Sequence, residues 1–232
     1  MYGFCFSFGM RSLCLVLAVL SSPLLQAGGP KDWALPDGPS MLGVITPPPS
    51  DGGAADLADL HAVEGMQASA TRTQLAHAEK IVNFTVFLFS DVRGDGFNAA
   101  AYPETASFFK KLESESNRPK NWIKDHYHRL RPYMAHSNLV KSLVTPEDGF
   151  SYPSGHAVRS WLDALVLGEL DPPRRAAYLG CAWQVNIDRV IGGMHYPSDT
   201  AAGRTLAESL FADLMADPAF KADLEALRKK EY

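Results

Sequence analysis

The sequence predicts an all-α fold, a single-domain helical bundle. Apolar residues recur at intervals of three and four along most of the chain, which is the periodicity of helices with one buried face. Most of these stretches end at proline or glycine, as helices commonly do. No Asn-Gly or Asp-Gly pair lies between alternating apolar runs, the pattern of a β-hairpin. The chain has 232 residues, which suits one domain with appendages, because a domain takes roughly 100–200 residues.

Residues 1–27 are interpreted as a signal peptide. Arg11 precedes an apolar run over residues 13–20, and Leu25-Gln26-Ala27 offers a cleavage site. The run is shorter than the about 20 residues that span a bilayer, so cleavage is favoured over an uncleaved anchor, and no stable membrane insertion is expected afterwards. Met10 is an alternative start. The segment predicts export from the cytoplasm.

Residues 28–53 form a Pro/Gly-rich lead-in, for which we expect extended or irregular backbone, and residues 54–232 form the folded domain. Residues 54–80 are Ala-rich with spaced apolar residues and predict a helix. Residues 81–89 are β-branched and aromatic, which suits a strand or a buried helix. The helical surroundings favour a helix.

The remaining helices are delimited mainly by proline and glycine. A residue before proline is biased away from the α region, so residues 105–112 and 119–130 predict two helices that stop near Pro119 and Pro132. Further helices are expected over residues 154–170 and 174–191, from Pro197 onward, and in a charged C-terminal segment after Asp217-Pro218.

The charge and cysteine counts limit the function. The chain carries 22 Lys and Arg against 26 Asp and Glu, a formal charge of −4, so no global excess of positive charge indicates a nucleic-acid polymer or an anionic membrane as partner. Any anion must be met by local charge. Cys5 and Cys14 lie in the signal segment, which leaves Cys181 without a disulfide partner. Cys181 is interpreted as a small buried residue and not a nucleophile.

The first group of candidate site residues is Lys124 and Arg131, followed by Pro132. In a helix, residues seven apart share a face, so both cations would point the same way and could hold a phosphoryl group, whose oxygens an Arg fork binds in pairs. Taken alone, a solvated basic face is the simpler interpretation. Lys111 and Arg118-Pro119 repeat the spacing thirteen residues earlier, but Glu113 and Glu115 lie between them. We therefore choose the later pair.

The second group is Ser154, Gly155 and His156 at the start of a helix. Ser154 is a natural N-cap, Gly155 permits close approach of a ligand to the backbone, and a helix N-terminus favours anions. His156 could pass a proton to a leaving oxygen. An ordinary capped helix with an exposed histidine explains the same residues.

The third group is Arg189, His195 and Asp199. A carboxylate on one ring nitrogen of His195 would leave the other nitrogen free to attack. A lone His-Asp pair is more often structural, but three groups with three cations, an anion cradle and two histidines favour phosphoryl chemistry. His61, His77, His126, His128 and His136 show no metal-binding pattern and are interpreted as surface or packing residues.

Together, Lys-x6-Arg-Pro, Pro-Ser-Gly-His and Arg-x5-His-x3-Asp resemble the type 2 phosphatidic acid phosphatase superfamily. Lys-Asp-His-Tyr at residues 124–127 and Ser-Tyr-Pro-Ser-Gly-His at residues 151–156 resemble, within it, the class A bacterial non-specific acid phosphatases. The resemblance implies the helical bundle of the acid phosphatase and vanadium haloperoxidase type, a periplasmic location, no metal or other cofactor, small phosphate monoesters as substrates, and a homo-oligomer.

The resemblance also implies the role of each residue. His195 is the nucleophile, Asp199 orients it, and His156 is the general acid and then the base. The phosphoryl oxygens are held by Lys124, Arg131, Arg189, Ser154 and the Gly155 backbone.

Two residues depart from the family pattern. Asp188 stands where the family has serine, and we expect it to pair with Arg189 and pre-position it. Arg159 follows His156 where small hydroxyl residues are usual, and is expected to face solvent or to widen substrate choice.

Three alternatives remain open. A vanadate-dependent haloperoxidase uses the same residues but is usually much longer. An integral-membrane lipid phosphatase needs apolar spans that the chain lacks. A phosphate-binding protein without turnover needs neither a proton donor nor an oriented nucleophile.

Overall fold

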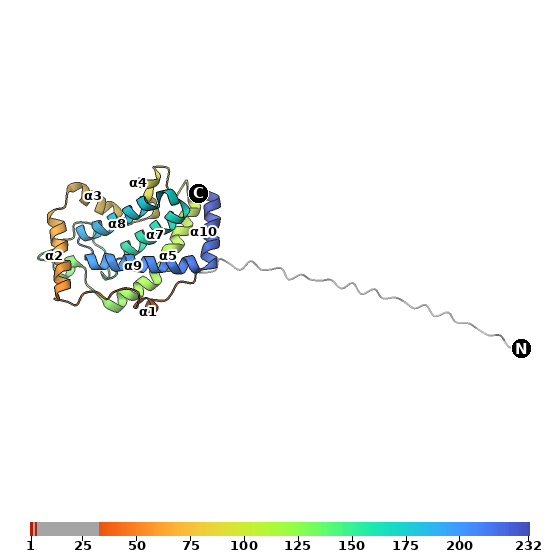
Figure 1. Cartoon of the computed structure of the whole chain (residues 1–232), viewed down its shortest axis with the longest axis horizontal. Coiled ribbons are helices and arrows are strands. Elements are labelled where there is room, and N and C mark those ends of the chain that lie inside the picture. The colour runs from red at the N-terminus through yellow and green to blue at the C-terminus, as the bar shows by residue number, and fades with distance from the viewer. Residues whose placement is uncertain (2, 4–32) are drawn as a thin grey trace. The chain divides into compact units, whose positions relative to one another are not determined.

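The computed structural model describes residues 1, 3 and 33–232, and this part of the chain contains helices and no strand (Figure 1). The predicted all-α class is confirmed. Apart from residues 1 and 3, the predicted signal peptide, with Cys5 and Cys14, lies outside the described residues. The α-helices are α1 (Gly38–Met41), α2 (Ala54–Ala68), α3 (Arg72–Lys80), α4 (Ser90–Arg93), α5 (Pro103–Tyr127), α6 (Pro132–Ala135), α7 (Gly155–Leu170), α8 (Arg175–Ile191), α9 (Pro197–Ala216) and α10 (Pro218–Glu231).

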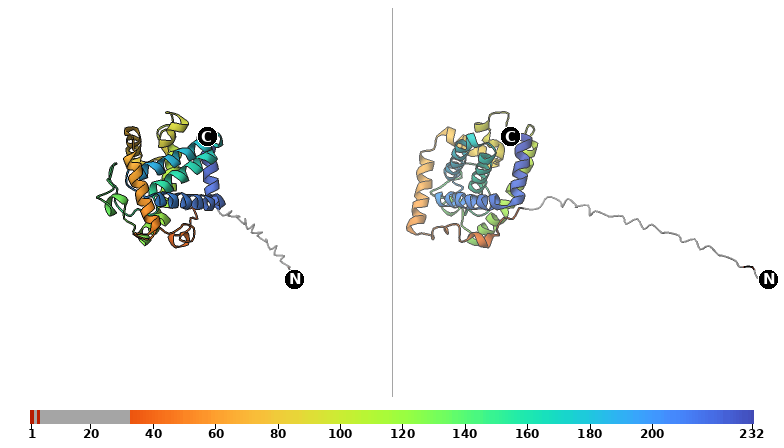
Figure 2. Two further views of the ribbon diagram at one scale, coloured as in Figure 1. Left: turned by 60° about the vertical axis from the view of Figure 1, so that its left-hand side comes forward. Right: turned by 45° about the vertical axis from the view of Figure 1, so that its right-hand side comes forward.

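Helix α7 is the central element of the bundle. Ser154 caps it, since the Ser154 hydroxyl accepts from the Ala157 N–H at 3.3 Å, as the sequence predicts. Most of its side chains are buried, because α8 and α9 pack on it along much of its length. Figure 2 shows α2 and α10 on opposite sides of the bundle, with α7 and α8 between them.

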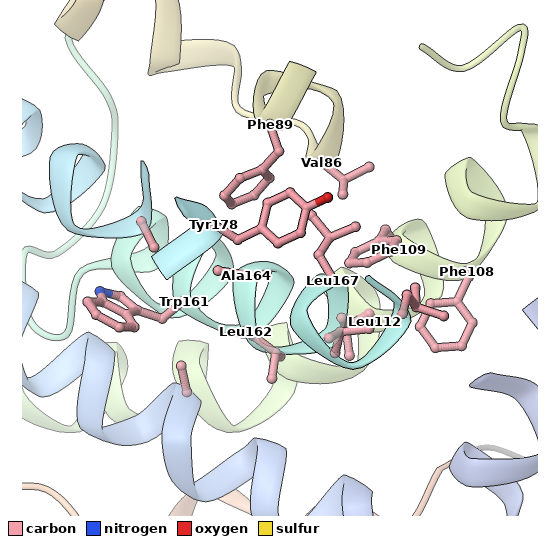
Figure 3. Packing of buried hydrophobic residues seen from close by; sticks show 14 of the residues in the cluster. Val86, Phe89, Phe108, Phe109, Leu112, Trp161, Leu162, Ala164, Leu167 and Tyr178 are labelled. Atoms are coloured by element: carbon pink, nitrogen blue, oxygen red, sulfur yellow. The ribbon is translucent and has the colours of Figure 1, made fainter. Parts of the chain in front are cut away.

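The main core lies between α7, α8, α5 and the segment before α4 (Figure 3). The Phe89 and Tyr178 rings meet edge to face with centroids 5.8 Å apart, and Leu167 is fully buried nearby. Burial of each such side chain contributes about 1.5–3 kcal/mol before the entropy of ordering is subtracted. This core holds the N-terminal end of α7 in a fixed place, and that end carries part of the candidate site.

The single helix expected over residues 54–80 is two helices, α2 and α3. Thr71 interrupts it: its side chain accepts from the Gln74 N–H while the Gln74 side chain accepts from the Thr71 N–H, a capping box that starts α3. Residues 81–89 form two short 3-10 helices, Ile81–Asn83 and Val86–Phe89, and not the expected α-helix. Thr85 between them is extended, which lets apolar side chains of both turns reach the core.

The prediction of two helices divided near Pro119 is wrong, because α5 runs unbroken through Pro119. Proline removes one helical hydrogen bond, but here it lies on the buried face of α5 together with Leu112, Ser116 and Ile123, and packing outweighs that loss. The helix ends instead at Tyr127, because His128 adopts the left-handed conformation with φ of 51°.

Part of the lead-in is ordered against the bundle. The Trp33 ring packs edge to face on Phe220, with centroids 4.9 Å apart, and also contacts Phe108. Its indole N–H donates to Asp223. Met41 and Ile45 are also buried. Within the part of the chain that the structure describes, no helix combines the length and apolar character that crossing a membrane requires.

Candidate active site

A cavity of about 880 Å³ opens between α5, the loop before α7 and the residues that follow α3. Of the eight predicted site residues, five line it: Lys124, Arg131, Gly155, His156 and His195. Asp199, Ser154 and Arg189 are buried behind its wall. The three sequence groups, separated by up to 75 residues, therefore meet at one place.

His195 is buried at the bottom of this cavity, with 1 % of its surface exposed. Its Nε2 lies 3.1 Å from Arg131 Nη1. Because an arginine can only donate, Nε2 must accept, so the ring proton is on Nδ1. Burial, and then the positive charges of Arg131, Lys124 and Arg189, hold the pKa of His195 well below its usual value. The imidazole is thus neutral, and the electron pair of Nε2 is directed at Arg131 Nη1.

Ser151 lies between His195 and Asp199. The Ser151 hydroxyl is 3.3 Å from His195 Nδ1 and donates to Asp199 Oδ2 at 2.5 Å, whereas Nδ1 and Oδ2 are 3.6 Å apart. Asp199 therefore holds the ring orientation largely through Ser151. Sequence reasoning missed Ser151, although it is the first residue of Ser-Tyr-Pro-Ser-Gly-His.

Arg129 fixes the Asp199 carboxylate from the other side. Arg129 Nη1 donates to Asp199 Oδ1 at 2.8 Å, and Nη2 donates to Asp56 and Asp59 of α2 at 3.0 Å each. Burial raises the pKa of Asp199 above its usual value, and the charge of Arg129 offsets this rise only in part. Burial lowers the pKa of Arg129, but the carboxylates of Asp199, Asp59 and Asp56 raise it by more. The pKa of Arg129 is therefore higher than usual. The sequence held no signal for this network, because α2 lies some 70 residues away.

Lys124 and Arg131 do meet at the cavity, but not by sharing a helical face. Lys124 is in the last turn of α5, and Arg131 is the N-cap of α6, beyond the left-handed His128. Lys124 Nζ donates to Phe150 O, and Arg131 donates to Asp148 O, Gly149 O and Met194 O at 3.1 Å. Burial, and then the charges of Arg131 and Lys120, lower the pKa of Lys124 to about 7.

His156 points its two ring nitrogens in different directions. Nε2 lies 3.0 Å from Ile81 O and 3.2 Å from Val82 O, and since carbonyls only accept, Nε2 carries a proton. Nδ1 faces Glu147, at 3.6 Å from Oε1. Burial and the charge of Arg189 hold the pKa of His156 well below its usual value, so Nδ1 is unprotonated in the free site.

Ser154 and Gly155 form the start of α7 beside this histidine. The Ser154 hydroxyl is buried and engaged as the N-cap, so its contact with phosphate stays a prediction. Gly155 lines the cavity, and a Cβ there would lie 3.4 Å from Lys120 Nζ. Lys120 is a cavity residue that sequence reasoning missed, because it belongs to none of the three motifs.

Arg189 is fully buried, and its guanidinium is poorly partnered. Nη2 lies 2.8 Å from Glu147 Oε1, yet none of Nε, Nη1 and Nη2 has a hydrogen-bond partner of acceptable direction among the described residues. Burial lowers the pKa of Arg189 to about 10, so it is charged at neutral pH.

The expected pairing of Asp188 with Arg189 is wrong. Asp188 Oδ2 contacts His77 Nδ1 at 2.6 Å, and Oδ1 accepts from Gln184 Nε2 at 3.0 Å. Asp188 points away from Arg189 because adjacent residues of a helix lie on different faces. His77, interpreted from the sequence as a surface or packing residue, is thus the partner of Asp188.

The carboxylates of Glu113 and Glu147 reduce the net positive charge of the cavity lining. Glu113, which lies between Lys111 and Arg118 in the sequence, lines the cavity and is paired with Arg159 at 2.7 Å. Arg159 thus faces the cavity and not bulk solvent. Glu147 also lines the cavity, and no sequence signal pointed to it, since it lies in a loop outside every motif.

The earlier Lys-Arg pair is not part of the cavity lining. Lys111 pairs with Asp223 at 3.2 Å, and Arg118 pairs with Glu115 at 2.9 Å on the same helix. Lys124 and Arg131 line the cavity instead, and their contact with a phosphoryl group stays a prediction. Among the described residues, no group of three or more His, Cys, Asp or Glu side chains is arranged to hold a metal.

An all-α bundle that gathers two histidines and several cations at one cavity is suited to hold an oxyanion. Residues 116–218 match the PAP2 superfamily, so this part of the chain is a PAP2 superfamily domain. The family resemblance of the motifs is thereby confirmed.

Curated relatives include the non-specific acid phosphatase of Salmonella typhimurium, 35% identical over 150 residues, which are 62% of this chain and 59% of that protein. The non-specific acid phosphatase of Providencia stuartii is 30% identical over 59% of this chain and 57% of that protein. The acid phosphatase of Zymomonas mobilis is 28% identical over 80% of this chain and 73% of that protein. The matched region thus spans just under three fifths of the Salmonella and Providencia relatives.

A solved structure shares the fold. The transmembrane PAP2 type phosphatidylglycerolphosphate phosphatase from Bacillus subtilis superposes with a TM-score of 0.52 and 19% identity, over 76% of this chain and 89% of that one. At this identity the likeness concerns the fold alone.

Proposed function

We propose that this chain is a metal-independent acid phosphatase that hydrolyses small phosphate monoesters through a phosphohistidine on His195. The observation that carries the proposal is the buried Arg189 guanidinium, which pairs with a single carboxylate, that of Glu147 at 2.8 Å, and has no well-directed hydrogen-bond partner for its three nitrogens among the described residues. A buried, under-partnered cation is expensive. A phosphoryl group offers the charge and the acceptor oxygens that such a cation needs.

In the first half-reaction the electron pair of His195 Nε2 attacks phosphorus. The bond from phosphorus to the ester oxygen breaks, and the leaving oxygen takes a proton from His156. His156 is neutral in the free site, but a bound dianion next to Nδ1 favours its protonated form. Arg131, Arg189 and Lys124 offset the charge on the phosphoryl oxygens, which is the larger part of catalysis in phosphoryl transfer.

In the second half-reaction water replaces the alcohol. His156 Nδ1 accepts a proton from the water, the hydroxide adds to phosphorus, and the bond to Nε2 breaks, which releases phosphate. Asp199, held by Arg129 and linked to the ring through Ser151, stabilises the His195 orientation and the positive charge that the ring bears while phosphorylated.

The test uses p-nitrophenyl phosphate in the presence of EDTA. We expect turnover to persist, and rapid quenching to trap an acid-labile, base-stable phosphate on His195. His195→Ala should abolish adduct and hydrolysis. His156→Ala should lower kcat by about 10²–10⁴-fold on alkyl phosphates and by less on p-nitrophenyl phosphate, whose leaving group needs little protonation. Inversion at phosphorus, without an adduct, would show direct attack by water and reject the proposal.

The proposal includes export to the periplasm after cleavage of residues 1–27, residues 54–232 as the acid phosphatase domain, and a homo-oligomer. These rest on the sequence pattern and on relatives that are named acid phosphatases. N-terminal sequencing of the protein recovered from the periplasm tests the first point, and sedimentation of the purified protein tests the last.

A further inference from the structure

The Glu147 carboxylate lies among the residues to which the proposed function assigns the phosphoryl group. Its Oε1 is 2.8 Å from Arg189 Nη2 and 3.6 Å from His156 Nδ1, and its Oε2 is 3.4 Å from Arg131 Nη2. One carboxylate thus touches two arginines and the acid-base histidine. A phosphoryl group bound between Arg131 and Arg189 needs the same contacts, so the two cannot be present together.

The backbone of Glu147 is held in place. The Tyr133 hydroxyl donates to Glu147 O at 3.2 Å, and Arg131 Nη2 donates to Asp148 O at 3.1 Å. Two residues earlier, the Thr145 N–H donates to Glu79 at 2.8 Å. The loop can therefore stay where it is when the carboxylate leaves.

The side chain of Glu147 is 22% exposed and lines the open cavity. Rotation about its own single bonds, which occurs between staggered states of similar energy, takes the carboxylate from the arginines toward solvent. Asp148, the next residue of the loop, also lines the cavity, but its carboxylate forms no ion pair with any described residue. The contacts with the arginines are thus specific to position 147.

We propose that Glu147 is an internal ligand of the oxyanion site and sets its affinity by competing with phosphate. The site then exists in two states, one closed on Glu147 and one open. An anion binds only the open state, so the apparent dissociation constant equals the intrinsic one divided by the open fraction. This inference rests on the proposed function, because it assigns Arg131, Arg189 and His156 to the phosphoryl group.

The experiment measures binding of inorganic phosphate by calorimetry to the wild-type protein, Glu147→Gln and Glu147→Ala. Loss of charge-assisted contacts in the closed state should tighten binding about tenfold or more in Glu147→Ala and by less in Glu147→Gln, which keeps an acceptor oxygen. Asp148→Asn removes an equal charge one residue away and should change affinity less than about twofold. Thermal melting checks that all variants are folded.

A second anion separates competition from simple repulsion. Near pH 6 phosphate is mostly a monoanion and sulfate is a dianion. Competition by Glu147 changes only the fraction of sites in the open state. Glu147→Ala should therefore tighten the binding of phosphate and of sulfate by the same factor. Simple repulsion by the Glu147 carboxylate would act more strongly on a dianion, so Glu147→Ala would then tighten sulfate binding more than phosphate binding. Such a difference, or an equal effect of Asp148→Asn, would overturn the inference.

Kinetics with p-nitrophenyl phosphate give an independent readout. Competition in the free enzyme predicts that Glu147→Ala lowers KM by the factor seen in phosphate binding and leaves kcat nearly unchanged. A fall in kcat or weaker phosphate binding would show instead that Glu147 positions Arg189 and His156, and would reject the inference. If phosphate binding tightens as expected but no variant or wild type turns over, the proposed function fails and the competition stands.

Discussion

Helix α5 and the turn after it contain the same Lys-x6-Arg-Pro pattern twice, in opposite environments. The earlier pair, Lys111 and Arg118, lies on a continuous helix and is matched by carboxylates of Asp223 and Glu115. The later pair, Lys124 and Arg131, is separated by the left-handed His128 and converges on the cavity. Equal spacing therefore does not give equal function.

The partners differ in kind as well as in place. Lys124 and Arg131 are held mainly by backbone carbonyls of the loop before α7. A carbonyl fixes the position of a cation without cancelling its charge, whereas a carboxylate cancels it. The later pair thus keeps a positive field available for an anion, apart from the contact of Arg131 with Glu147.

The largest expected difference between the two pairs concerns their arginines. Arg131→Ala should lower kcat/KM for p-nitrophenyl phosphate by roughly tenfold to a hundredfold or more, since a charge-assisted contact contributes about 1.5–3 kcal/mol. Arg118→Ala removes an exposed ion pair, so the change should be less than about twofold. Steady-state kinetics of both variants measure this, and equal losses would refute the distinction between the pairs.

The two lysines should differ in their effect on pH dependence. Burial and the charges of Arg131 and Lys120 lower the pKa of Lys124 to about 7, so Lys124 is charged below that pH and becomes neutral above it. Phosphate monoesters are already dianions there, with a second pKa of about 6. KM should therefore rise above pH 7, by up to about tenfold per unit.

Arginine stays protonated across this range, so Lys124→Arg should flatten the rise in KM between about pH 7 and pH 9. Lys111→Arg is the matched control and should leave the profile as in the wild type. A rise that persists in Lys124→Arg would mean that another group titrates.

The smallest expected effect concerns the backbone that separates the pairs. His128 is left-handed, which costs a non-glycine residue about 1–2 kcal/mol, so His128→Gly should raise the free energy of unfolding by about 0.5 kcal/mol after loss of its ring contact with Phe150. Glu115 lies four residues after Lys111, as His128 lies four residues after Lys124, but Glu115 is inside α5. Glycine costs about 1 kcal/mol there, so Glu115→Gly should lower the free energy of unfolding. Urea unfolding of both variants measures the sign of each change in the free energy of unfolding. A lower free energy of unfolding for His128→Gly would contradict the expected strain at this residue.

Several features could be read from local sequence. Helix α7 begins where Ser154 and Gly155 predict it, and α9 and α10 begin at Pro197 and Pro218, because caps and prolines act over a few residues. Pro119 shows where a prediction from local residues fails. Its effect on the backbone is local, but the burial that keeps α5 intact comes from distant helices.

The sequence by itself predicted the helical class, the motifs of the PAP2 superfamily domain and the three groups of candidate site residues, since each depends on residue types at short spacing. Only the tertiary structure decided what each group contacts. It brought Arg129 to Asp199, turned Asp188 toward His77, and placed Glu147 against Arg189. These contacts join residues far apart in the chain, and burial by the whole bundle determines both which of them form and how strongly their charges interact.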